Sequence, residues 1–216
     1  MEHTQTPALV ICGHGMVAQR LLEQLVATGH PFSRIVVFNG EPFAAYNRIQ
    51  LSSLLANQVR ESELELKPRS WFRQHKIEVY NREPVTAVEP HQRRVTTASG
   101  RTLAYHTLVL ATGASPSRLG LPGEDLDGVM TFRDLADTRT LIHQAQTHRR
   151  AVVIGGGFLG LEAAEGLRAR GMDVTVLHRS GHLLNRQLNP AASELLKHQL
   201  QQRGLTVLTG TEPTAL

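Results

Sequence analysis

The pattern that most constrains this chain is a glycine motif that follows a short apolar run, Ala151–Ile154. Such a run, rich in β-branched residues, is typical of a buried parallel strand. Gly155, Gly157 and Gly160 follow it with G-x-G-x-x-G spacing, and helical periodicity then continues to about Arg170. This order predicts a strand, a tight turn and a helix whose N-terminal amides face a dinucleotide pyrophosphate.

A second motif of the same kind lies near the start of the chain. Ala8–Cys12 is apolar throughout, and Gly13 and Gly15 follow it directly. Ala18, a tolerated small residue, occupies the position of the third glycine, within a helix expected over Met16–Ala27. Two such turns predict two dinucleotide sites in one chain, which indicates a flavoenzyme with a nicotinamide partner.

The fold class that these motifs predict is α/β, with two Rossmann-like, three-layer lobes built on parallel sheets. We expect an FAD-binding lobe over residues 1–118 and an NAD(P)-binding lobe over residues 119–216, joined by a linker at Leu119–Gly128. An antiparallel meander is expected within the first lobe, with strands at Glu78–Tyr80, Pro84–Val88, Arg94–Thr97 and Arg101–Ala104. Further strands are expected at Arg34–Phe38, Thr107–Ala111, Val174–Leu177 and Leu205–Leu208, and further helices at residues 134–148 and Pro190–Arg203.

The residues after the second strand of each lobe bear on nucleotide recognition, because an acid there usually binds the adenosine ribose. In the first lobe position 39 is Asn, so the nearest carboxylate, Glu41, is the predicted ribose ligand; the alternative is a solvated turn acid. In the second lobe His178 and Arg179 stand where NAD-binding proteins carry an acid. Arginine can pair with a 2′-phosphate, which favours NADPH, unless Arg179 points to solvent.

Composition excludes several other classes of function. The chain has 23 basic and 19 acidic residues, without a run of like charge or a row of aromatics, which argues against a nucleic-acid interface. Its single cysteine, Cys12, excludes an internal disulfide or a thiolate cluster, and we interpret it as a packed thiol. His178 and His182 are separated by Ser180 and Gly181, so we expect no metal site. Without a signal peptide or a membrane-spanning run, the chain is expected to be cytoplasmic.

Several segments together resemble one known family. They are the first glycine turn with Met16-Val17, the pair Glu41-Pro42, the segment Tyr46-Asn47-Arg48…Leu51-Ser52-Ser53, the second glycine turn, and Arg186-Gln187-Leu188. The chain resembles the two-dinucleotide-domain flavoprotein reductases. Within them it is most similar to the N-terminal flavin module of the bacterial NAD(P)H-dependent nitrite reductase large subunit and to the electron-transfer subunit of assimilatory nitrate reductase.

The resemblance implies a role for individual residues. The FAD contacts that it implies are Gly13, Gly15, Met16 and Ala18 at the pyrophosphate, Arg48 at the phosphates, Glu41 at the ribose, Val85 beside the adenine, and Ala111, Thr112 and Gly113 where the chain crosses to the other lobe. Gly155, Gly157 and Gly160 would receive NAD(P)H. Glu162 would lie near the meeting point of nicotinamide and flavin, and is the one candidate catalytic residue; the alternative is a solvated helix acid.

The activity implied is electron transfer from NAD(P)H through FAD to the iron–sulfur or sirohaem centre of a nitrite or nitrate reductase domain or subunit. Two alternatives stay open. The first is a truncated, catalytically silent nucleotide-binding fragment. The second is a ferredoxin or rubredoxin reductase, which Ser53 disfavours because many such relatives carry lysine there. The family continues past residue 216, so the fold is expected to be incomplete at its C-terminus, with a homodimer possible through uncovered edges.

Overall fold

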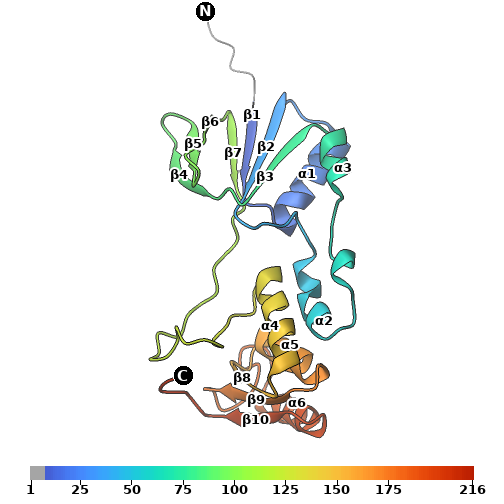
Figure 1. Ribbon diagram of the computed structural model, residues 1–216, viewed down its shortest axis with the longest axis vertical. Helices are drawn as coiled ribbons and strands as arrows, with labels where there is room; N and C mark the ends of the chain where they lie inside the picture. Colours follow the sequence, from blue (N-terminus) through green and yellow to red (C-terminus); the bar gives the residue numbers. More distant parts are fainter. Residues whose placement is uncertain (1–7) are drawn as a thin grey trace, which may run out of the picture. The chain divides into compact units, whose positions relative to one another are not determined.

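The computed structural model describes residues 8–216 (Figure 1). The first seven residues, on which the expectation about a signal peptide rests, lie outside the described residues. The chain divides into two compact units: Met1–Arg48 with Leu64–Ala114, and Ile49–Glu63 with Ser115–Leu216. The assignment of lobes to residues 1–118 and 119–216 stays a prediction about domains.

The first unit is built on a four-stranded parallel sheet with strand order β3-β2-β1-β7 (Figure 1). Its strands are β1 (Ala8–Cys12), β2 (Arg34–Asn39), β3 (Ile77–Asn81) and β7 (Thr107–Leu110). The middle strands β1 and β2 are buried on both faces, as their continuous apolar runs predict. The α/β class with parallel sheets is thereby confirmed for this unit.

Two layers cover the sheet of the first unit. On one face lie α1 (Met16–Thr28) and α3 (Arg69–Gln74), which pack Leu22 and Phe72 against Ile11 and Val37. On the other face lies an antiparallel meander of β4 (Val85–Glu89), β5 (Arg94–Thr97) and β6 (Thr102–Ala104), which packs Val95 against Val36 and Phe38. Alternate residues of each sheet strand therefore supply two separate cores.

The position of β3 corrects one expectation. The sequence predicts Glu78–Tyr80 as the first strand of the antiparallel meander, and this is wrong. β3 pairs parallel to β2, with Ile77 opposite Ile35 and Tyr80 opposite Phe38. Its alternating pattern has a different cause. β3 is an edge strand of the sheet, and only its first residue is buried, so it lacks the continuous apolar run of a central parallel strand.

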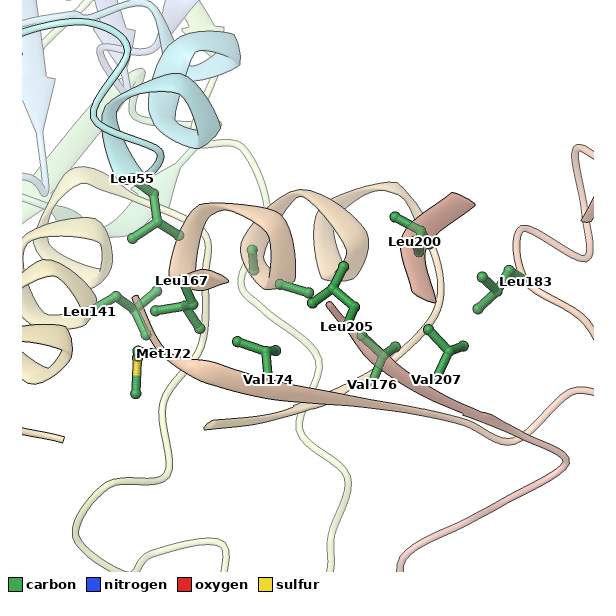
Figure 2. Close-up of a cluster of buried hydrophobic side chains, with 12 residues drawn as sticks. Leu55, Leu141, Leu167, Met172, Val174, Val176, Leu183, Leu200, Leu205 and Val207 are labelled. Carbon is green, nitrogen blue, oxygen red and sulfur yellow. The ribbon is translucent and has the colours of Figure 1, made fainter. Parts of the chain in front are cut away.

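The second unit has a three-stranded parallel sheet with strand order β10-β9-β8. Its strands are β8 (Arg150–Ile154), β9 (Asp173–His178) and β10 (Thr206–Thr209), and its longer helices are α4 (Leu135–Thr147), α5 (Phe158–Ala169) and α6 (Pro190–Gln202). Figure 2 shows the core, in which Val174, Val176 and Val207 of the sheet lie below Leu167 of α5 and Leu200 of α6. None of the helices within residues 8–216 is long and apolar enough to cross a membrane.

A segment between β2 and β3 completes the core of the second unit. It contains 3₁₀ turns at Arg48–Gln50 and Glu61–Glu63 and the short helix α2 (Leu51–Leu55). Figure 2 shows Leu55 directed toward Leu141 and Leu167. The Arg170 guanidinium donates to the carbonyl oxygens of Leu54 and Leu55 at the end of α2. Periodicity alone does not predict this docking.

Candidate functional site

The first glycine turn is fixed by the close approach of two strand ends. Gly13 has φ 98°, and a Cβ there would lie 2.2 Å from the carbonyl oxygen of Ala111 and 2.8 Å from Cα of Thr112. Gly13 N donates to Phe38 O and Ala111 N donates to Cys12 O, both at 2.7 Å. The structure therefore brings the predicted contacts Ala111 and Thr112 to the first glycine turn.

The next glycine of this turn has a different environment. Gly15 is the N-cap of α1 with φ −89°, and a Cβ there would meet no atom within 4 Å. Met16 begins the helix, and Ala18 is fully buried against the sheet. Gly15 therefore faces open space at a helix N-terminus, which leaves room for phosphate oxygens to approach the backbone.

The second turn repeats this arrangement. Gly155 has φ 123°, and a Cβ on Gly160 would lie 1.9 Å from the carbonyl oxygen of Gly155, so the helix and turn can meet only at a glycine. Gly157 is the N-cap of α5, and a Cβ there would meet no atom within 4 Å. The open position again lies at the start of the helix.

The helices that follow the two glycine turns, α1 and α5, which we call the cradle helices, differ from α4 and α6 in how their N-termini are capped. No side chain caps α1 or α5, and neither helix has an acidic residue in its first turn. By contrast, Asp134 caps α4 by accepting from Asp137 N at 2.8 Å, and Asn189 caps α6 by accepting from Ala192 N at 2.9 Å. The first amides of a helix lack intrahelical partners and carry the positive end of its dipole. Both glycine turns can therefore bind an anion such as a pyrophosphate.

The turn after β2 is organised by the buried side-chain amide of Asn39, which stands where dinucleotide-binding folds usually have an acid. Asn39 is 4% exposed, and its Nδ2 donates to Phe43 O at 2.7 Å and to Asn81 Oδ1 at 2.9 Å. Its Oδ1 accepts from Glu41 N at 3.2 Å. Asn39 thus shapes the turn that carries the predicted ribose ligand, a role that sequence reasoning missed.

The Glu41 carboxylate is held by two side chains. Arg48 donates to its Oε1 at 2.5 Å, and the Tyr46 hydroxyl donates to its Oε2 at 2.8 Å. The Arg48 guanidinium also lies 5.2 Å from the centre of the Tyr46 ring. Two predicted FAD contacts thus bind each other and share a contact with Tyr46, for which the sequence predicts no role. Their roles toward FAD stay predictions.

The end of β1 lines a hollow with the edge of the meander. Its volume is about 220 Å³, and its lining includes Cys12, Val85, Val88, Leu110 and Thr112. The hollow brings the predicted adenine contact, Val85, beside Thr112. Burial raises the pKa of the Cys12 thiol to about 11, so the thiol stays protonated at neutral pH, as expected of a packed thiol.

His14 lies between the two glycines of the first turn and was also missed. It is buried, and its Nε2 lies 3.3 Å from Oε1 of Gln19, whose Nε2 donates to Glu23 Oε1 at 3.2 Å. An amide oxygen can only accept, so Nε2 of His14 carries the hydrogen, and its buried Nδ1 meets no partner within residues 8–216. Burial lowers the pKa of His14, which keeps the ring neutral.

His178 lies against the second turn. Its Nδ1 accepts from Gly156 N at 3.1 Å, which leaves Nε2 as a buried donor that meets no partner in the described part of the chain. A Cβ on Gly156 would lie 2.8 Å from Cγ of His178, so the middle glycine is needed for this contact. Arg179 and Glu162 are exposed, and their roles stay predictions. Within residues 8–216 no three His, Cys, Asp or Glu side chains gather as metal ligands.

Two glycine turns, each joining a parallel strand to a helix without a side-chain cap, define a protein with two dinucleotide cradles. Residues 7–216 match the family model described as pyridine nucleotide-disulphide oxidoreductase, and the chain belongs to this family. Its members are FAD-dependent NAD(P)H oxidoreductases, so the two cradles have known counterparts.

Two curated relatives from Bacillus subtilis are similar to nearly the whole chain. The chain is 42% identical over 200 residues to an assimilatory nitrate reductase electron transfer subunit and 39% identical over 200 residues to a nitrite reductase [NAD(P)H]. Both matches cover 93% of this chain, but it spans only 26% and 25% of the two relatives. Among solved structures, the ferredoxin reductase for the CYP199A2 system from Rhodopseudomonas palustris matches with a TM-score of 0.90 at 28% identity, covering 97% of this chain and 52% of that one.

Proposed function

We propose that this chain is a flavin module that takes electrons from NAD(P)H and passes them through FAD to the iron–sulfur or sirohaem centre of a nitrite or nitrate reductase domain or subunit. The observation that carries the proposal is the pair of uncapped helix N-termini, each behind an open glycine, at Gly15 and Gly157. Dinucleotides supply the anion that such amides bind. Two cradles in one chain suit a flavin and a nicotinamide.

In this proposal the first unit binds FAD. The amides that follow Gly15 bind its pyrophosphate, and Arg48 adds a charged contact to the phosphates. Glu41 accepts from the adenosine ribose, and Val85 lines the hollow that takes the adenine. When bound, FAD supplies the chemistry that converts two-electron oxidation of a nicotinamide into single-electron steps.

The second unit binds NAD(P)H. The amides after Gly157 receive its pyrophosphate, and the exposed Arg179 reaches the 2′-phosphate of NADPH. Gly156 N donates to Nδ1 of His178, so Nε2 carries the ring hydrogen and can donate a hydrogen bond to a ribose oxygen. A donor at this position does not repel a 2′-phosphate as a carboxylate does, so both nicotinamides are expected to bind.

The acceptor is proposed from the two Bacillus subtilis relatives, of which one is named an assimilatory nitrate reductase electron transfer subunit and the other a nitrite reductase [NAD(P)H]. With a single cysteine this sequence cannot supply the thiolates of an iron–sulfur cluster, so that centre belongs to a partner domain or subunit. A second candidate, reduction of a ferredoxin, is supported by the 0.90 TM-score to a ferredoxin reductase. Ser53 speaks against it, because many such reductases carry lysine there.

The test is to titrate the purified chain with FAD and then supply NADH or NADPH with either ferricyanide or nitrite as acceptor. We expect sub-stoichiometric FAD as purified, binding of added FAD, and reduction of ferricyanide but not of nitrite. Failure to bind FAD would refute the proposal that this chain is a flavin module. Nitrite-dependent oxidation of NAD(P)H by the chain alone would refute the assignment of the acceptor to a partner.

A further inference from the structure

One aromatic ring contacts both of the predicted FAD ligands of the first unit. The Tyr46 hydroxyl donates to Glu41 Oε2 at 2.8 Å, while the face of its ring lies 5.2 Å from the guanidinium carbon of Arg48. Arg48 in turn donates to Oε1, the other oxygen of the same carboxylate. Tyr46 thereby contacts both charged groups, one through its hydroxyl and the other through the face of its ring.

The backbone around Tyr46 is fixed on both sides. Tyr46 forms an antiparallel bridge with Glu65, Asn47 N donates to Leu64 O at 2.8 Å, and Leu66 N donates to Ala45 O at 3.2 Å. The side chain is 7% exposed, and the edge of the Phe43 ring packs against it at 6.5 Å between centroids. Its hydroxyl therefore stays in place when charged neighbours rearrange.

The Glu41 carboxylate has about four acceptor positions, and in this structure Arg48 occupies one on Oε1 and Tyr46 one on Oε2. A ribose offers two hydroxyl donors, and departure of Arg48 would leave Oε1 entirely to them. A phosphate offers Arg48 a stronger, bidentate partner. Arg48 can turn toward a phosphate while its guanidinium stays over the Tyr46 ring, a contact that does not depend on the carboxylate.

We propose that Tyr46 is a positioning residue for FAD: it holds Oε2 of Glu41 while Arg48 transfers from Oε1 to an FAD phosphate and the ribose hydroxyls take its place. This inference rests on the proposed function and adds to it a residue and an exchange of partners. Without the Tyr46 hydroxyl, the departure of Arg48 leaves the Glu41 carboxylate free to rotate away from the ribose.

The test is a double-mutant cycle read out as FAD affinity, with Tyr46→Phe, Glu41→Ala and the double variant. Tyr46→Phe keeps the ring and its contact with Arg48 and removes only the hydroxyl. We expect it to weaken FAD binding about tenfold, because a hydrogen bond to a charged group is lost. In the Glu41→Ala background the same change is expected to have no further effect, because the hydroxyl then has no carboxylate to hold.

A matched control exists in the same unit. The Tyr80 hydroxyl donates to Glu78 Oε2 at 2.9 Å, and neither residue is a predicted FAD contact, so Tyr80→Phe keeps the ring, removes an equivalent bond and should leave FAD affinity unchanged. An equal loss from Tyr46→Phe with and without Glu41, or a loss matched by Tyr80→Phe, would overturn the inference while leaving the proposed function intact. Absence of FAD binding to the unsubstituted chain would instead overturn the proposed function.

Discussion

Gly166 of α5 lies directly against Leu55 of α2: a Cβ added at position 166 would stand 2.7 Å from Cγ and 3.1 Å from Cβ of Leu55. Both residues are buried, and Leu55 belongs to the core of the second unit. A rotamer change alone does not relieve the clash, because Leu55 is fully buried among other side chains and its Cβ moves only with the backbone. The short helix α2 can dock on the cradle helix because position 166 carries no side chain.

Gly166→Ala is therefore expected to destabilise the chain, although alanine favours helices more than glycine does. Overpacking of this kind lowers the free energy of unfolding by about 1–3 kcal/mol. Urea unfolding measures the change. The control is the Leu55→Ala background, where the space is free and Gly166→Ala should be neutral or stabilising. Equal destabilisation in both backgrounds would show that the two residues are not coupled.

Alanine substitutions at the two glycines of the first turn are expected to differ in their effect on the free energy of unfolding. Gly13→Ala places a Cβ against the Ala111 backbone at a positive φ, so it should lower the free energy of unfolding by about 2–4 kcal/mol or prevent folding. Gly15→Ala meets no atom and should change stability by less than about 0.5 kcal/mol. Chemical unfolding of both variants checks this. Similar stability losses at the two positions would contradict it.

Arg179→Ala is expected to weaken NADPH more than NADH, by roughly 1–3 kcal/mol, because only NADPH carries the phosphate that the guanidinium can bind. Calorimetric titration of each nucleotide gives the difference. The control is Arg149→Ala, which removes an exposed charge just before β8, at the strand end away from the second glycine turn. Equal losses for both nucleotides, or none, would show that Arg179 does not contact the phosphate.

The buried His14 predicts an acid-sensitive first unit. Burial lowers its pKa in the folded chain below 6.5, its value when solvated. The unfolded chain therefore takes up a proton before the folded chain does, and stability should fall as the pH drops from 6.5 toward the lowered pKa. Urea unfolding on both sides of pH 6.5 should show this loss for the unsubstituted chain and less of it for His14→Asn. Identical pH dependence in the two chains would contradict it.

Local sequence was sufficient to predict both strand–turn–helix units. The tight turn requires glycine at position 155 and the close helix contact requires glycine at position 160, and the apolar runs before both turns indicate burial on two faces. The helices and most strands lie within one or two residues of their expected bounds. These features depend on residues that are close together in the chain.

The features that sequence reasoning missed depend on tertiary pairing or on side-chain contacts within irregular turns. The sequence of β3 resembles that of a meander strand because an edge strand, like an antiparallel strand with one solvated face, carries polar residues between apolar ones. The docking of α2 depends on Gly166 and Arg170, more than 100 residues away. Tyr46 belongs to the Tyr46-Asn47-Arg48 segment that carries the family resemblance, but its hydrogen bond to Glu41 requires a turn shaped by Asn39. Such contacts leave no periodic signal.

The most direct test of two separate dinucleotide cradles is calorimetric titration of FAD and NADPH against Gly15→Ala and Gly157→Ala. The added Cβ fills the open space before α1 in the first variant and before α5 in the second. The account predicts that Gly15→Ala weakens FAD binding by about tenfold or more and leaves NADPH unchanged, and that Gly157→Ala does the reverse. Loss of both nucleotides in either variant, or of neither, would contradict it.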